Sequence, residues 1–153
     1  MQVWRLAKTR YAASPFDGEG ARLYGARWNS RGTRVAYASD SSALAVLEVV
    51  VHLSGGGGSP AGYSLISATV PDAMIEELDP ATLPKDWNVS PIPPSVQLLG
   101  DQWIATGRSL ALRVPSVIVE GGFILLINPE HKGFARVSVQ SISAYAFDPR
   151  LLR

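Results

Sequence analysis

The sequence predicts an α+β fold: a single compact domain with a mixed, mostly antiparallel sheet and a few helices. Apolar runs of strand length recur along the whole chain, and glycines and prolines separate them. Helical spacing of apolar residues is confined to a few segments. More strand than helix is therefore expected.

Composition limits the classes of protein to consider. The chain has 153 residues, 46% of them hydrophobic, which is enough for one core, so residues 1–153 are expected to form one domain. A net charge of +1 gives no overall field that would favour nucleic acid or an anionic membrane. The absence of cysteine excludes disulfides and thiolate zinc sites. With no secretory signal and no apolar stretch near the roughly 20 residues of a membrane span, a soluble cytoplasmic protein is expected.

The expected strands are apolar runs bounded by turn residues. They cover residues 3–6, 35–39, 63–70, 110–119 and 123–129, with one or two more within 136–147. The nearly continuous apolar character of 110–119 and 123–129 predicts that these two lie in the middle of the sheet.

Two longer helices and one short helix are expected. The first covers Ser42 to Leu53, with Asp40 or Ser41 as its N-cap and the four glycines from Gly55 as its end. The second covers residues 95–109, and a short acidic helix is expected over 74–78. Residues 9–32 and 79–94 show little periodicity and are expected to be loops.

Arginines gather in one of these loops. Arg22, Arg27, Arg31 and Arg34 lie in a stretch that contains no acid. Their planar guanidinium groups suit a phosphate or diphosphate, and a solvated basic loop is the alternative. Arg27 stands out because Gly25 and Trp28 flank it and offer close backbone approach and an aromatic wall.

A carboxylate and a phenol follow the arginines. Glu48 is the one charged residue between Ser42 and Val51, where helical spacing places it beside Leu44, Leu47 and Val51. A carboxylate in such a stripe needs a partner, so it is either half of a buried ion pair or part of a functional site. Together with Tyr37 in an apolar strand, Arg27 and Glu48 indicate a site for an anionic ligand.

The side chains available exclude several chemistries. The histidines, His52 and His131, lack metal-ligand spacing, so no metal is expected. Ser116 lacks a nucleophile elbow, and no phosphate-binding glycine loop is present. A carboxylate, a tyrosine and arginines suit cleavage of an N-glycosidic bond next to a diphosphate, because a carboxylate stabilises an oxocarbenium-like transition state. Tyrosine can stack on the leaving base, arginine can anchor the phosphates, and a cationic nicotinamide leaves without a general acid.

An ordered set of motifs carries a family resemblance. The motifs are Gly25 to Gly32, the strand with Tyr37, the helix from Ser42 to Glu48, Gly100-Asp101-Gln102-Trp103, Val114-Pro115-Ser116, and Asn128-Pro129 before His131. In this order and spacing the chain resembles RES-domain toxins, the toxic halves of bacterial toxin–antitoxin pairs. The arginine, glutamate and serine in the family's name match Arg27, Glu48 and Ser116. Many relatives have an asparagine where this chain has Gly122-Phe123-Ile124.

The resemblance implies a fold related to ADP-ribosyltransferase toxins and an enzyme that consumes NAD. The nicotinamide–ribose bond would be cleaved by a glycohydrolase or phosphorylase reaction, causing growth arrest. Glu48, Arg27 and Tyr37 would be catalytic, and Arg27, Trp28, Tyr37, Ser116 and Asn128 would bind NAD. The implied partner is a helix-turn-helix antitoxin of the Xre type that blocks the site and binds operon DNA, so the toxin itself needs no nucleic acid or membrane. A homo-oligomer within the toxin–antitoxin complex is compatible with this picture.

Three alternatives stay open at this point. The first is an ADP-ribosyltransferase that acts on a specific protein. The second is a ribonuclease-type toxin that uses the arginines of residues 22–34, although the net charge and the lack of a histidine pair disfavour it. The third is a non-enzymatic binding module in which Arg27 and Glu48 form a buried ion pair.

Overall fold

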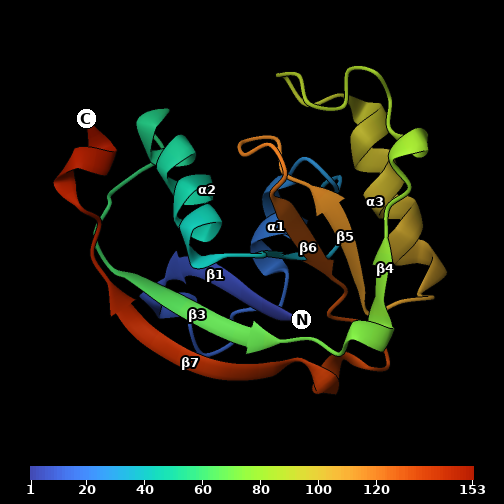
Figure 1. Ribbon diagram of the computed structural model, residues 1–153, viewed down its shortest axis with the longest axis horizontal. Helices are drawn as coiled ribbons and strands as arrows, with labels where there is room; N and C mark the ends of the chain where they lie inside the picture. Colours follow the sequence, from blue (N-terminus) through green and yellow to red (C-terminus); the bar gives the residue numbers. More distant parts are fainter.

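A single curved sheet organises the protein. The computed structural model describes residues 1–153 and has a seven-stranded sheet in the order β4-β5-β6-β2-β1-β3-β7 (Figure 1). The strands are β1 (Gln2–Lys8), β2 (Ala36–Ser39), β3 (Tyr63–Thr69), β4 (Ile75–Glu77), β5 (Ala111–Pro115), β6 (Phe123–Ile127) and β7 (Ser138–Tyr145). Only β4 and β5 are parallel, and all other neighbours are antiparallel. The predicted α+β fold with a mixed, mostly antiparallel sheet is confirmed.

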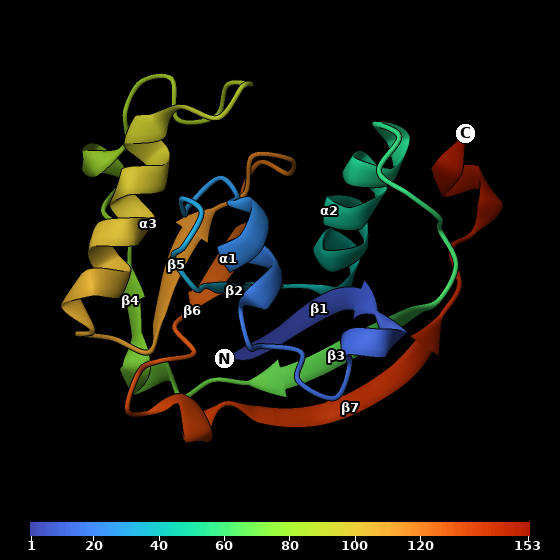
Figure 2. The same cartoon turned by 180° about the vertical axis from the view of Figure 1, so that it is seen from behind.

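The helices pack beside this sheet. They are α1 (Glu19–Tyr24), α2 (Ser42–Ser54) and α3 (Pro94–Thr106), with short 3-10 turns at Thr9–Tyr11, Asp72–Met74, Pro80–Thr82, Phe134–Arg136 and Pro149–Leu152. In Figure 1, α2 lies over β1 and β3, and α3 lies beside β4 and β5; Figure 2 shows α1 from behind. The Ser41 hydroxyl caps α2 by accepting a hydrogen bond from the Leu44 N–H at 3.1 Å, as expected from the sequence. None of the helices combines the length and apolar character needed to cross a membrane.

Alternation along the short central strand β2 divides the core between the two faces of the sheet. Ala36 and Ala38 pack in a cluster that includes Phe16, on the face that the segment before α1 covers. Tyr37 packs on the other face, in a cluster that includes Trp28 and Leu44. This alternation directs Tyr37 toward the side of the sheet where α2 lies.

The prediction of an acidic helix over residues 74–78 is wrong, because Ile75–Glu77 form strand β4. A helix this short is unstable without a packed face. Here the backbone pairs with β5, and the carboxylates of Glu76 and Glu77 form ion pairs with Arg108 and Arg113 at 2.6 and 2.5 Å. Pairing with a neighbouring strand therefore decides the conformation.

Helix α1 lies in a region expected to be loop. It has six residues, shows no apolar periodicity and contains Gly20. Gly18 precedes it with φ of 70°, and a Cβ at Gly18 would lie 2.9 Å from the Val35 backbone. The helix thus depends on a close tertiary contact that periodicity does not reveal.

Candidate functional site

The loop that carries Arg27 is rigidly built; we call residues 25–33 the arginine loop. Asn29 is fully buried at its centre. The Asn29 amide donates to the carbonyls of Ala21, Ser30 and Thr33 at 2.8, 3.1 and 3.1 Å. The Tyr37 hydroxyl donates to Asn29 Oδ1 at 2.7 Å and accepts from the Trp28 N–H at 3.1 Å. An asparagine and a tyrosine therefore fix the backbone on both sides of Trp28.

Helix α3 supports the arginine loop from the other side. Asp101 accepts two hydrogen bonds from Ser30, one from the N–H at 2.9 Å and one from the hydroxyl. Gln97 donates to two carbonyls of the loop at 3.0 and 3.3 Å. A Cβ on Gly100 would lie only 1.7 Å from the Trp28 carbonyl oxygen, so only glycine permits this approach. The loop is held directly against the helix.

Arg27 reaches from this loop to the segment before α3. Its Nη1 donates to the carbonyls of Trp87 and Val89 at 2.9 and 3.1 Å. The Trp87 ring lies 6.1 Å from the Trp28 ring, with the two planes tilted by 31°. No other nitrogen of Arg27 has a protein acceptor. The guanidinium therefore keeps donors for an anionic ligand.

Glu48, in the middle of α2, completes the site. Burial raises the pKa of Glu48, whereas the positive charge of Arg27 and the nearby Ser116 hydroxyl act to lower this pKa. The structure thus brings Arg27, Glu48 and Ser116 together. No Arg27 nitrogen lies within 4.0 Å of a Glu48 oxygen, so the two do not form the contact ion pair that the binding-module alternative assumed.

Ser116 is placed by the turn that ends β5. It is 8% exposed, and its hydroxyl oxygen accepts from the N–H groups of Ile118 and Val119, both at 3.1 Å. A hydroxyl has one proton to donate, and the two N–H donors at the oxygen leave this proton available to a nearby acceptor. The same turn explains why the strand ends at Pro115 and does not continue to residue 119 as expected.

Comparison with known proteins identifies the family. The family model described as "RES domain" matches residues 2–149. The chain belongs to the RES domain family. It is 38% identical to "Toxin Res" of Yersinia enterocolitica over 153 residues, covering 99% of both chains. It is also 38% identical to "Prs ADP-ribosylating toxin" of Sphingobium, covering 98% of this chain and 96% of the relative.

A solved structure shares the fold of this RES domain. The crystal structure of the M. tuberculosis MbcT–MbcA toxin–antitoxin complex superimposes with a TM-score of 0.77. The match covers 99% of this chain and 86% of that chain, with 20% sequence identity. The two structures therefore share one fold over nearly the whole of this chain.

Tyr37 of the RES domain has a supporting position in this structure. Burial raises its pKa, so the phenol stays protonated at neutral pH. Both hydrogen-bonding capacities of the hydroxyl are directed to the arginine loop, at Trp28 and Asn29. The hydroxyl supports the loop, and stacking of the ring on a base stays a prediction.

Asn128 does not join the other predicted site residues. It follows β6 at the end where its N–H bonds to the Leu110 carbonyl, whereas Ser116 bonds to Gly122 at the opposite end. The five-residue strand between these ends spans about 17 Å at about 3.4 Å per residue. Asn128 Oδ1 instead accepts from the Glu130 N–H at 3.0 Å and closes a turn.

Two arginines of the sequence cluster are already paired. Arg22 and Arg34 form ion pairs with Glu19 at 2.5 and 2.8 Å. The hydrogen bond from Arg22 lowers the pKa of the Glu19 carboxyl to about 2. Glu19 lies three residues before the acid-free stretch of residues 22–34, so this stretch alone did not reveal Glu19 as the partner of Arg22 and Arg34. Arg27 is the arginine of this cluster whose charge acts on Glu48.

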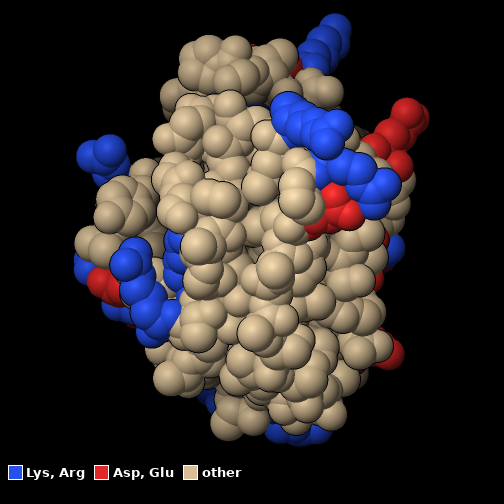
Figure 3. All heavy atoms as spheres, turned by 90° about the vertical axis from the view of Figure 1, so that its left-hand side faces the viewer, with Lys and Arg blue, Asp and Glu red and all other residues tan.

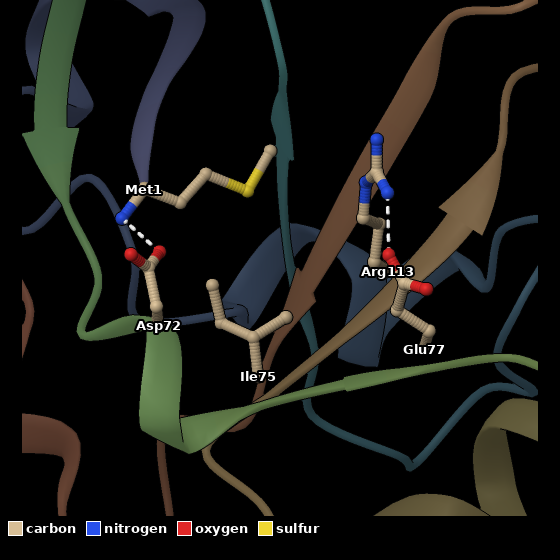
Figure 4. Close-up of a pocket in the computed structure, with 5 residues that line it drawn as sticks. All are labelled: Met1, Asp72, Ile75, Glu77 and Arg113. Atoms are coloured by element: carbon tan, nitrogen blue, oxygen red, sulfur yellow. Dashed lines mark hydrogen bonds and ion pairs between the residues drawn. The ribbon is translucent and has the colours of Figure 1, made fainter.

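A surface cavity of about 450 Å³ lies away from this site. Met1, Asp72, Ile75, Glu77 and Arg113 line it (Figure 4). The Met1 ammonium pairs with Asp72 at 2.6 Å, and Arg113 pairs with Glu77 at 2.5 Å. Arg113 alternates along β5 with Leu112 and Val114, which pack in the cluster of Trp28, so it lies on the other face of the sheet. The charged groups that line the cavity are paired with one another. We therefore place the candidate functional site at Glu48 and not at this cavity.

Helix α2 is only partly buried. Leu44 is 2% exposed, but Val51, expected on the same face, is 50% exposed. On the side of the molecule that Figure 3 shows, charged side chains lie toward the border and the centre is largely uncharged. The apolar residues of α2 are therefore buried at Leu44 and exposed at Val51.

Several supporting residues were not predicted to have a role. Asn29, Gly100 and Asp101 belong to the motifs of the family resemblance, whereas Gln97 belongs to none of them. Each acts through contacts between segments distant in sequence, such as Ser30 with Asp101. Trp87, in the loop before α3, packs against Trp28.

Proposed function

We propose that this RES domain is the toxin of a bacterial toxin–antitoxin system and that it consumes NAD by cleaving the nicotinamide–ribose bond. The observation that supports this most is the Glu48 carboxylate, which is half-buried near Arg27 and Ser116. The names of the relatives, "Toxin Res" and "Prs ADP-ribosylating toxin", support the same class of activity.

The residues divide the work of the reaction. The free donors of Arg27 bind the diphosphate of NAD. As the bond between ribose C1′ and the nicotinamide nitrogen breaks, its electron pair leaves with nicotinamide, which becomes neutral. The ionised Glu48 carboxylate stabilises the positive charge that develops on the ribose. Ser116 holds that carboxylate in place by donating its hydroxyl proton in a hydrogen bond.

The acceptor completes the reaction. Water gives ADP-ribose and a proton, and phosphate gives ADP-ribose 1″-phosphate. Tyr37 supports the arginine loop and is proposed to contact the nicotinamide ring. Trp28 is proposed to line the site. No side chain is needed to protonate the leaving group, because it departs from a cationic pyridinium.

A protein side chain is the alternative acceptor. The bond-breaking step is the same, and the Sphingobium relative named as an ADP-ribosylating toxin supports this second reaction. A ribonuclease has less support, because two arginines of the cluster are paired with Glu19.

The proposed protein partner is a cognate antitoxin of the helix-turn-helix type. The structure with the same fold was solved as a toxin–antitoxin complex, which supports such a partner. The uncharged centre of the face in Figure 3 suits contact with a protein more than contact with nucleic acid. The proposed location is the bacterial cytoplasm, where NAD is available.

Nicotinamide release tests the proposed function. The purified toxin without its antitoxin is incubated with NAD beside a Glu48→Gln variant, each with and without phosphate. Release by the wild type and its loss in the folded variant are expected, and dependence on phosphate identifies a phosphorylase. Release only when a cell extract supplies an acceptor would favour protein modification. No release under any of these conditions would refute NAD consumption.

A further inference from the structure

Arg5 is a half-buried arginine in strand β1 that no motif explains. Alternation along β1 places it on the same face as Val3, which is fully buried. Its Nη1 donates to the Tyr37 carbonyl at 2.6 Å, but its Nε is buried without a hydrogen-bond partner. No carboxylate lies within 4.0 Å of it. A buried donor without a partner on a charged group is costly to keep, which indicates a role other than stability.

The position of Arg5 compensates for a gap in the sheet. Strand β1 pairs with β3 through all seven of its residues, but it pairs with β2 only at Trp4 and Ser39. On the other side, β2 pairs with β6 along its whole length. The Tyr37 carbonyl therefore faces a place where β1 offers no N–H, and the Arg5 side chain supplies the missing donor.

Tyr37 connects this contact to the functional site. Its carbonyl accepts from Arg5, and its hydroxyl bonds to Trp28 and Asn29 of the arginine loop. A shift of the β2 backbone at Tyr37 would therefore move the loop that carries Arg27. We propose that Arg5 is a positioning residue for NAD cleavage, which holds β2 so that Tyr37 keeps the arginine loop in its binding geometry. This inference rests on the proposed function.

A matched set of variants tests this role. Arg5→Met keeps the length of the side chain and removes the donor, and Arg5→Lys restores one donor. Arg113→Met is the control, because the Arg113 Nε is also buried without a partner and Arg113 lies on the sheet face away from Glu48. The measurements are the melting temperature, kcat and KM for nicotinamide release, and hydrogen exchange in residues 25–33.

A positioning role and a purely structural role give different results. We expect Arg5→Met to melt close to the wild type, because removal of the half-buried charge offsets loss of the hydrogen bond to the Tyr37 carbonyl. Its KM should rise by about tenfold with a smaller change in kcat, because misplacement of Arg27 weakens the binding of NAD. Exchange in residues 25–33 should become faster, Arg5→Lys should recover most of the KM, and Arg113→Met should keep wild-type kinetics.

Two outcomes would overturn the inference. Unchanged KM and exchange in Arg5→Met would show that Arg5 does not hold the loop. A fall in melting temperature that accounts for the lost activity, without recovery in Arg5→Lys, would show a structural role only. If the wild type released no nicotinamide, the proposed function would fail, and the exchange of residues 25–33 would still decide whether Arg5 positions the loop.

Discussion

At the scale of single residues, the Glu48 carboxylate is balanced between burial and its neighbours. Burial favours the protonated form, and Arg27 and Ser116 favour the ionised form. The proposed reaction needs the ionised form, so activity should fall as the pH drops through the pKa of Glu48. Each neighbour that lowers this pKa extends activity toward acidic pH.

Ser116→Ala should therefore shift the pH profile. The Ser116 hydroxyl acts to lower the pKa of Glu48, so its removal should raise this pKa further and move the acidic limb of kcat/KM for nicotinamide release to higher pH. Loss of the contact should also lower the plateau by about tenfold, the effect of one hydrogen bond to a charged group. Ser67→Ala is a suitable control, because Ser67 is also buried but bonds to Ser141. An unshifted acidic limb in Ser116→Ala would contradict the role given to Ser116.

Glu48→Gln should lower activity but raise the stability of the fold at neutral pH. A carboxyl whose pKa is raised by folding binds its proton more tightly in the folded state, so its contribution is most favourable at low pH and is lost as pH rises through the folded pKa. At neutral pH the variant lacks this penalty and should melt at a higher temperature than the wild type. The difference should shrink toward pH 4, and thermal melts over this pH range measure it. A lower melting temperature at neutral pH would show that the charge stabilises the fold.

At the scale of elements, the site depends on contacts between α3 and the arginine loop. Gly100→Ala would place a Cβ 1.7 Å from the Trp28 carbonyl oxygen. Because the backbone must move, we expect a loss of about 1–3 kcal/mol in the free energy of unfolding. Gly20→Ala, in α1, is the matched control, since nothing lies within 4 Å of its Cβ position, and it should stabilise by about 0.5–1 kcal/mol. Urea denaturation compares the two, and equal stabilities would refute the close packing.

The same contacts show what sequence can predict about this fold. Helix α2 and strands such as β3 follow from apolar patterns and a cap, which are local signals. Arg27, Glu48 and Ser116 were named from motifs, and the structure places them together. Strand β4 was not predicted because its partner β5 decides it, and Asn128 was assigned to the site although the length of β6 separates it from Ser116. Both features depend on pairing between strands that are distant in sequence, which local apolar patterns and motifs do not reveal.

At the scale of the whole molecule, the two edges of the sheet differ. Edge strand β4 has three residues, two of them glutamates in ion pairs. Edge strand β7 has eight residues, none charged, and Val139 and Ile142 are 42% and 50% exposed. In Figures 1 and 2, β7 runs along the outside of the sheet with no element beyond it. A long uncharged edge is a template for pairing with another strand, whereas short charged edges resist it.

We therefore expect β7 to govern self-association of the chain at high concentration. Ile142→Lys should lower the fraction of dimers and larger species, because a charge on the edge repels a second copy. Val51→Lys is the control, since Val51 is also 50% exposed but lies on α2. Light scattering after size-exclusion chromatography, over a range of protein concentrations, measures both variants. Equal reductions would assign association to general apolar exposure, and a reduction only in Val51→Lys would move the contact surface from β7 to α2.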